Sequence, residues 1–337
     1  MNDRRITGRL WLTVIACLAG AGALALPSQS RAQASYPTHP IKVIVPFTAG
    51  GSSDLSARRV SEGMSRILGQ PLIMENKPSA GGIVGVNDVA QAAPDGYTLL
   101  AGTISTHALN VGLYKNLSYD PLKDFTPITR IGSFPNVLVV NSALNISTLA
   151  DLIKLAKERD KQGKPLSYAS GGNGSTSHLG GVLLGQVAGV ELLHIPYKGA
   201  AGAMPDLLSG RVDMLFANIQ LIQQHLASGT LKALAVTTST RSNLLPDVPT
   251  VAELGFKNAE MSVWIALFAP KNIPAAMAQK LNAAAIQAMK SPAVVEGFAK
   301  EGVIAEYDES PAAFRTFLAA EVDKWSKVVR ASGATAD

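Results

Sequence analysis

Two Gly/Ser-rich turns, each lying where a short apolar run meets a helical pattern, constrain this chain most. The first spans residues 46–54 (PFTAGGSSD) and the second spans residues 169–178 (ASGGNGSTSH). Each turn would begin a helix, and a helix N-terminus offers unpaired backbone N–H groups and the positive end of the helix dipole. Such an end binds anions, so two of them facing one cleft would bind a small carboxylate.

Strand-like runs and helical patterns alternate along the chain. Nine apolar runs are typical of strands, at 41–47, 71–75, 98–102, 138–141, 167–170, 192–196, 212–216, 231–237 and 262–268. Nine segments have helical periodicity, at 52–68, 82–92, 148–160, 177–188, 201–208, 221–227, 274–289, 292–301 and 311–331. This alternation indicates an α/β fold with mostly parallel sheets. Ligands of open α/β sheets bind at the carboxyl ends of strands, where both turns lie.

The first 34 residues have the features of a secretory signal peptide. Arg4, Arg5 and Arg9 precede a mostly apolar, uncharged stretch at 10–30, and the segment closes with Ala32-Gln33-Ala34, a small-x-small cleavage pattern. We expect cleavage after Ala34 and a periplasmic location.

Two other readings of this leader are less favoured. A retained membrane anchor would need a longer apolar run. Lipid anchoring at Cys17, the only cysteine, is disfavoured because the apolar run continues beyond it.

The remaining chain of about 300 residues is long enough for two domains of ordinary size. It would contain no cysteine, so its stability must come from core packing rather than disulfides. Loss of the leader lowers the formal net charge from +5 to +2. We find no basic cluster that suggests nucleic acid and no later run of membrane-spanning length.

Two apolar strands, near residues 138 and 265, could both be crossings between two lobes. The expected organisation is a cleaved leader (1–34), a discontinuous first lobe (35–137 plus 260–337) and a second lobe (138–259). The C-terminal helices would complete the first lobe.

The sequence resembles the periplasmic receptors of tripartite tricarboxylate transporters, the Bug family, over essentially the whole chain after the leader. Each matching motif is short, but their order and spacing are specific. They are Tyr36-Pro37, Pro40-Ile41, Val45-Pro46-Phe47, Ala49-Gly50-Gly51, Asp54, Glu75-Asn76-Lys77, Gly81-Gly82, Asp95-Gly96-Tyr97, Thr106-His107-Ala108, Ser175, His178-Leu179, Tyr197-Lys198-Gly199, Leu234-Ala235-Val236-Thr237, Asp247-Val248-Pro249-Thr250 and Phe268-Ala269-Pro270.

The resemblance implies the two-lobed "Venus flytrap" fold of type II periplasmic binding proteins. It also implies a monomeric receptor that binds a small carboxylate and passes it to a permease of one large and one small membrane subunit. No cofactor or metal is expected.

The resemblance also places the ligand-binding residues in four groups. The first clamp comprises Phe47, Thr48, Ala49, Gly50, Gly51, Ser52 and Asp54. Ser105, Thr106 and His107 would line the same lobe. The second clamp comprises Ser170, Asn173, Gly174, Ser175 and His178. Tyr197, Lys198 and Asn218 would lie at the rim of the cleft.

Several of these residues also have a purely structural interpretation. Asp54 could shape its turn rather than contact the ligand, because its charge would repel a carboxylate. His107 and His178 could be structural hydrogen-bonding residues, and Lys198 could be a solvated turn charge. Relatives often carry Asp-Asn where this chain has Ala217-Asn218, which would disfavour an amino-acid ligand if that carboxylate met an ammonium group.

A hydrolase and a signalling receptor are the two alternatives to a transport receptor. A hydrolase triad of Ser175, His178 and Asp54 is disfavoured because the Gly-x-Ser-x-Gly elbow that would present a nucleophile is missing. A receptor that docks on a signalling partner, rather than a permease, fits the same sequence features. The identity of the carboxylate does not follow from the sequence.

Overall fold

A computed structural model describes residues 36–197 and 199–336. The predicted leader, with Cys17, and the rim residue Lys198 lie outside these ranges. Residues from His39 onward form one compact unit. The division into two lobes at 137/138 and 259/260 therefore stays a prediction.

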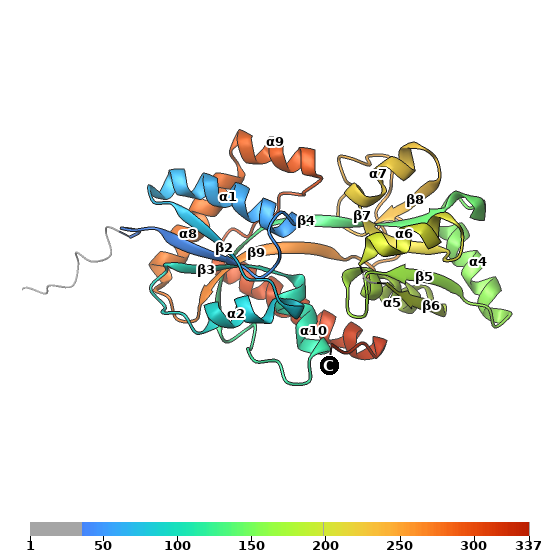
Figure 1. Ribbon diagram of the computed structural model, residues 1–337, viewed down its shortest axis with the longest axis horizontal. Helices are drawn as coiled ribbons and strands as arrows, with labels where there is room; N and C mark the ends of the chain where they lie inside the picture. Colours follow the sequence, from blue (N-terminus) through green and yellow to red (C-terminus); the bar gives the residue numbers. More distant parts are fainter. Residues whose placement is uncertain (1–35, 198, 337) are drawn as a thin grey trace, which may run out of the picture. The chain divides into compact units, whose positions relative to one another are not determined.

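The core of this unit is one nine-stranded sheet flanked by helices (Figure 1). The order of the strands is β2-β1-β3-β9-β4-β7-β5-β6, with β8 also paired to β4. The strands are β1 (Ile41–Val45), β2 (Leu72–Asn76), β3 (Thr98–Thr103), β4 (Phe125–Asn141), β5 (Leu166–Ser170), β6 (Leu192–Pro196), β7 (Met214–Asn218), β8 (Leu231–Val236) and β9 (Ser262–Pro270).

The sheet is mixed rather than mostly parallel. β1 pairs in parallel with β2 and β3, and β5 pairs in parallel with β6 and β7. All pairings of β4 and β9 are antiparallel. The two long strands run side by side in opposite directions, and they join the two halves of the sheet (Figure 1).

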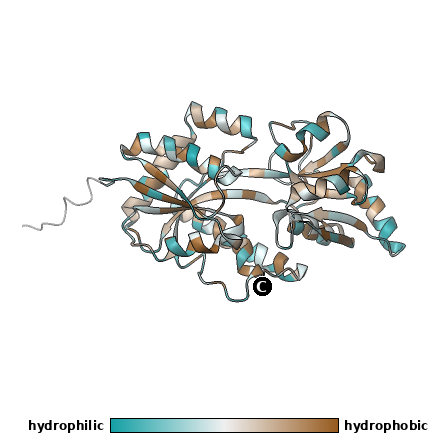
Figure 2. Ribbon diagram, viewed as in Figure 1, coloured by the Kyte–Doolittle hydropathy of each residue, from teal (hydrophilic) through white to brown (hydrophobic). Residues whose placement is uncertain are grey.

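Helices cover both faces of the sheet. They are α1 (Ser52–Leu68), α2 (Ile83–Ala90), α3 (Asn110–Leu113), α4 (Leu149–Lys161), α5 (Thr176–Ala188), α6 (Ala200–Leu208), α7 (Ile219–Ala227), α8 (Ala275–Met289), α9 (Pro292–Glu301) and α10 (Pro311–Ser332). Short helical turns lie at Ala80–Gly82, Ser105–Leu109 and Ser142–Leu144. Apolar residues concentrate along the strands, whereas the helices carry both polar and apolar residues (Figure 2).

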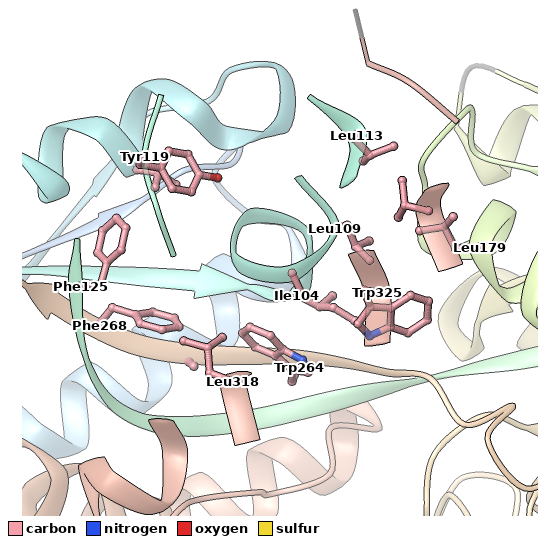
Figure 3. Close-up of a cluster of buried hydrophobic side chains, with 14 of the residues drawn as sticks. Ile104, Leu109, Leu113, Tyr119, Phe125, Leu179, Trp264, Phe268, Leu318 and Trp325 are labelled. Atoms are coloured by element: carbon pink, nitrogen blue, oxygen red, sulfur yellow. The ribbon is translucent and has the colours of Figure 1, made fainter. Parts of the chain in front are cut away.

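A large buried cluster lies where β3 and β9 meet α10. It contains Trp264 and Phe268 from β9 and Trp325 from α10 (Figure 3). Leu179 of α5 joins the same cluster, so the helix that follows the second Gly/Ser turn packs against α10 as well as against β5, β6 and β7. Burying large apolar side chains of this kind contributes about 1.5–3 kcal/mol each.

Most predicted elements are confirmed within a few residues, and α1, α9 and β6 match their predicted bounds. The predicted strand at 138–141 is too short, because β4 begins at Phe125. The unpredicted part of β4, residues 125–137, contains Pro127, Gly132 and Pro135, which usually interrupt strands. The register with β9 shifts between Pro127 and Thr129 and again between Arg130 and Gly132, and these irregularities accommodate the breakers.

Candidate functional site

The first Gly/Ser turn is organised around the buried side chain of Asp54. The N–H of Gly50 donates to Asp54 Oδ2 at 2.8 Å, and Arg58 Nε donates to both carboxylate oxygens at 3.0 and 2.9 Å. Asn76 Nδ2, at the end of β2, donates to Asp54 Oδ1 at 2.9 Å and to the carbonyl of Phe47 at 3.1 Å. Every carboxylate oxygen is therefore occupied by a donor of the protein itself.

This network fixes the charge of the turn as well as its shape. Burial alone would raise the pKa of Asp54, but the hydrogen bonds from Arg58, Gly50 and Asn76 outweigh it and hold that pKa below its usual value. Asp54 is 1% exposed. It acts as a scaffold of the turn, and Arg58 compensates its negative charge.

A cavity of about 180 Å³ opens at the N-terminal end of α1. Its lining residues come from the first turn, from β3 and the turn after it, and from the two long strands and the end of β7. They are Phe47, Ser52, Ser53, Thr103, Ser105, Phe134, Asn218, Val263 and Ile265. A second cavity of about 570 Å³ shares Ser52, Phe134 and Asn218 with it and adds Gly50, Leu55 and Lys300.

The structure thus brings together five of the predicted ligand-binding residues around these two cavities: Phe47, Gly50, Ser52, Ser105 and Asn218. Thr48 and Ala49 lie exposed on the same turn, and Gly51 is the N-cap of α1.

Thr106 and His107 are fully buried instead of lining the cavities. Thr106 Oγ1 accepts from the N–H of Thr103 at 2.9 Å and lies 2.8 Å from His107 Nδ1. The His107 ring stacks on Phe268 with 3.8 Å between centroids, and burial lowers its pKa to about 3. Neither side chain reaches the two cavities in this packing, because the turn after β3 points both of them into the core.

The second Gly/Ser turn is held mainly by its own side chains. The N–H of Gly171 donates to Ser177 Oγ at 2.9 Å, and Ser175 Oγ donates to the carbonyl of Gly172 at 2.7 Å. Ser175 is also the N-cap of α5, accepting from the N–H of His178.

The predicted residues of this turn differ in exposure. Ser170, Gly174 and His178 are buried, whereas Asn173 is exposed. Asn173 and His178 line a groove of about 720 Å³ between α5, β6 and the end of α10. This groove shares no lining residue with the two cavities at α1. The predicted convergence of both turns on one cleft therefore stays a prediction.

The two described rim residues have different surroundings. Tyr197 donates its hydroxyl to Asp206 at 2.7 Å, and its backbone N–H donates to the carbonyl of Ser170, which ties the turn before α6 to the second Gly/Ser turn. Asn218 is exposed and lines both cavities. Ala217 faces the other way, into a buried cluster with Val137 and Leu207. A side chain at 217 thus points into the core rather than toward the cavities.

A model of the family described as the tripartite tricarboxylate transporter family receptor matches residues 56–334. The chain belongs to this receptor family. A UPF0065 protein of Agrobacterium vitis is 40% identical over 335 residues, covering 99% of this chain and 92% of the relative. Protein BugT of Bordetella pertussis is 38% identical over 327 residues, covering 96% of this chain and 97% of the relative.

Two ligand-bound structures from Rhodopseudomonas palustris are similar to this receptor. Rpa4515 with adipate is 33% identical with a TM-score of 0.72, covering 89% of this chain and 99% of that chain. MatC with bound malate is 32% identical with a TM-score of 0.69, covering 87% of this chain and 100% of that chain. The receptor thus has the α/β fold of type II periplasmic binding proteins, and its family consists of periplasmic solute-binding receptors rather than enzymes.

Sequence reasoning missed several residues that line the receptor's smaller cavity. Phe134 lies in the part of β4 that was not predicted as a strand, residues 125–137. Ser53 directly follows the predicted site residue Ser52. Thr103 and Ile265 are cross-strand neighbours, so they share one face of the sheet. Thr103 directly follows the predicted strand at 98–102 and lies two residues before Ser105, whereas Ile265 lies on the predicted strand at 262–268 with no predicted site residue beside it. In the described residues no group of three or more His, Cys, Asp or Glu could hold a metal ion, and no helix could span a membrane.

Proposed function

We propose that this protein is an extracytoplasmic solute receptor that binds a small carboxylate at the N-terminal end of α1. We further propose that it delivers this solute to a permease of the tripartite tricarboxylate type, with one large and one small membrane subunit. The observation that carries the proposal is the cavity at the start of α1 in a chain of this family.

The helix end supplies the groups that bind the carboxylate. α1 has 17 residues, and the backbone N–H groups of its first turn, including those of Ser52 and Ser53, have no acceptor within the helix. The helix dipole favours an anion at this end. The side chains of Ser52, Ser105 and Asn218 add neutral donors.

The walls of the smaller cavity suit a ligand with a short hydrocarbon body. Phe47, Phe134, Val263 and Ile265 provide apolar surface. A cavity of about 180 Å³ corresponds to about six water molecules at liquid density. Carboxylates such as the malate and adipate bound by the two similar receptors are of suitable size.

The second turn would supply the remaining contacts from the second lobe (138–259), through Asn173, Ser175 and the backbone. The ligand would contact both lobes only when they are closed around it. Binding would therefore shift the equilibrium toward the closed form. Asp54, Ser170, Gly174 and His178 support the two turns, and Tyr197 supports the turn before α6.

Calorimetric titration of the purified protein, unfolded and refolded to remove carried-over ligand, tests the binding step. Malate, adipate and benzoate are compared with their amides. We expect micromolar dissociation constants for at least one acid, which corresponds to about 8 kcal/mol, and loss of binding for its amide. Folded protein that binds none of the acids would refute the small-carboxylate assignment.

Uptake of the radiolabelled carboxylate tests the delivery step. Cells that contain the permease subunits should accumulate it only when this receptor is present. Accumulation that is independent of the receptor would refute delivery and favour a sensing role.

A further inference from the structure

Three aromatic side chains form a stack beneath the second Gly/Ser turn. The rings of His178 on α5 and His194 on β6 lie 3.8 Å apart between centroids, with planes inclined by 10°. The ring of Tyr168 on β5 lies 5.0 Å from that of His194. A Cβ at Gly181 would lie 2.2 Å from Tyr168, so only glycine lets α5 approach this stack.

Each histidine of the stack holds a different part of the turn. The backbone N–H of Gly174 donates to His178 Nδ1 at 3.0 Å. His194 Nε2 lies 2.6 Å from Ser170 Oγ, which in turn accepts from the N–H of Gly172 at 3.1 Å. The beginning and the middle of the turn are thus each held by one particular imidazole nitrogen.

The contact with Gly174 defines the protonation of His178. A ring nitrogen that accepts a hydrogen bond carries no proton, so His178 is neutral and bears its proton on Nε2. Burial and the neighbouring His194 lower the pKa of His178 to about 4, and burial lowers that of His194. The other titratable groups along the groove are Tyr168 and Glu191, and the segment 331–334 contributes none.

We propose that His178 and His194 are positioning residues that hold the second Gly/Ser turn in its ligand-binding shape through His178 Nδ1 and His194 Nε2. The proposal rests on the carboxylate receptor function proposed above. Neither histidine contacts the ligand in this arrangement, because the groove that they line is separate from the cavities at α1.

Replacing each histidine in turn by Asn and by Gln distinguishes a hydrogen-bonding role of the ring nitrogen from mere packing of the side chain. Asn places its oxygen near the position of Nδ1, whereas Gln reaches the position of Nε2. At neutral pH, His178→Asn and His194→Gln should keep the wild-type dissociation constant within about twofold. His178→Gln and His194→Asn each lose one hydrogen bond of the turn and should weaken binding about tenfold. Adipate and malate serve as probes, and His225→Asn and His225→Gln on α7 are the controls.

A second measurement does not need ligand. Hydrogen exchange at the amide of Gly174 should stay slow in His178→Asn and accelerate at least tenfold in His178→Gln, with melting temperatures followed in parallel. Equal exchange and equal affinity in both variants would overturn the proposal. A wild-type protein that binds neither probe but shows the crossed exchange pattern would refute the receptor function alone.

Discussion

The two Gly/Ser turns occupy equivalent places in the fold but are built from different chemistry. The turn after β1 is held by a buried carboxylate, Asp54, with Arg58 as its counter-charge. The turn after β5 is held by serine hydroxyls and by two imidazoles, His178 and His194. Each arrangement occupies backbone groups of its turn, and the two turns lie at separate hollows, the first at the cavities beside the start of α1 and the second at the groove along α5. A shared sequence pattern therefore does not imply a shared mechanism of support.

The largest effect is expected from removing the carboxylate of the first turn. Asp54→Ala leaves Gly50 N–H, Arg58 and Asn76 without their acceptor and should lower the free energy of unfolding by about 2–3 kcal/mol, measured by urea denaturation. Arg58 is partly exposed and regains water, which limits the loss. Asp323→Ala, at an exposed pair with the same i,i+4 spacing, is the control and should cost less than about 0.5 kcal/mol. Equal effects would contradict a scaffold role for Asp54.

Proline substitutions at the first helical position compare the two turns as donors. Ser52→Pro removes one amide N–H at α1, and Thr176→Pro removes the corresponding one at α5. Gly51 and Ser175, which precede them, already have the extended backbone that proline requires. Ser52→Pro should weaken carboxylate binding about 10- to 100-fold in calorimetry, because it removes a charge-assisted hydrogen bond from the backbone together with the Ser52 hydroxyl.

Thr176→Pro measures whether the second turn donates to the same ligand. A similar loss would place both helix ends at the carboxylate. Ala275→Pro, at the first position of α8, should leave binding unchanged. If Ser52→Pro also binds as the wild type does, α1 is not the anion site.

Acidification should weaken the second turn before the first. His178 has a folded pKa of about 4, below its usual 6.5, so the unfolded chain takes up the proton first and stability falls as pH drops from about 6.5. Between pH 6.5 and 5 this costs about 1.5 kcal/mol per such histidine. The folded pKa of Asp54 is below its usual 3.8, so its contribution is lost only as pH falls below that value.

Urea denaturation at pH 6.5 and pH 5 measures this difference. The loss of stability between the two pH values should be smaller in His178→Asn by about 1.5 kcal/mol than in the wild type. His225→Asn should retain the wild-type loss. An unchanged loss in His178→Asn would contradict a neutral, buried His178.

The smallest effect is expected from exchanging the helix caps. Gly51 caps α1 without a side chain, whereas Ser175 caps α5 through its hydroxyl. A Cβ at Gly51 would meet the carbonyl of Thr48 at an ordinary 3.5 Å. Gly51→Ser should raise the free energy of unfolding, and Ser175→Gly should lower it, each by a few tenths of a kcal/mol in denaturant titrations. A large loss in Gly51→Ser would show that the first turn has no room for a side-chain cap.

The sequence was sufficient for the order of strands and helices, because apolar periodicity reports local structure directly. It could not place side chains that depend on distant strands. Phe134 reaches the cavity only because bulges let β4 run through Pro127 and Gly132 against β9. His107 follows a strand end like the cavity residue Ser105, yet it is buried on Phe268 from β9. The local sequence pattern does not indicate whether a side chain will be buried by strands that lie far away in the sequence.

The position of β9 has a consequence for the order in which the chain can fold. β9 lies between β3 and β4, so residues 262–270 separate two strands that precede them by more than a hundred positions. During synthesis, the first half of the sheet cannot close until this late segment emerges. By contrast, β4 to β8 can pair with one another from a continuous stretch of sequence. β1, β2 and β3 can pair with one another earlier, but they cannot be joined to β4 until β9 arrives, and these long-range pairings make this the slower half to fold.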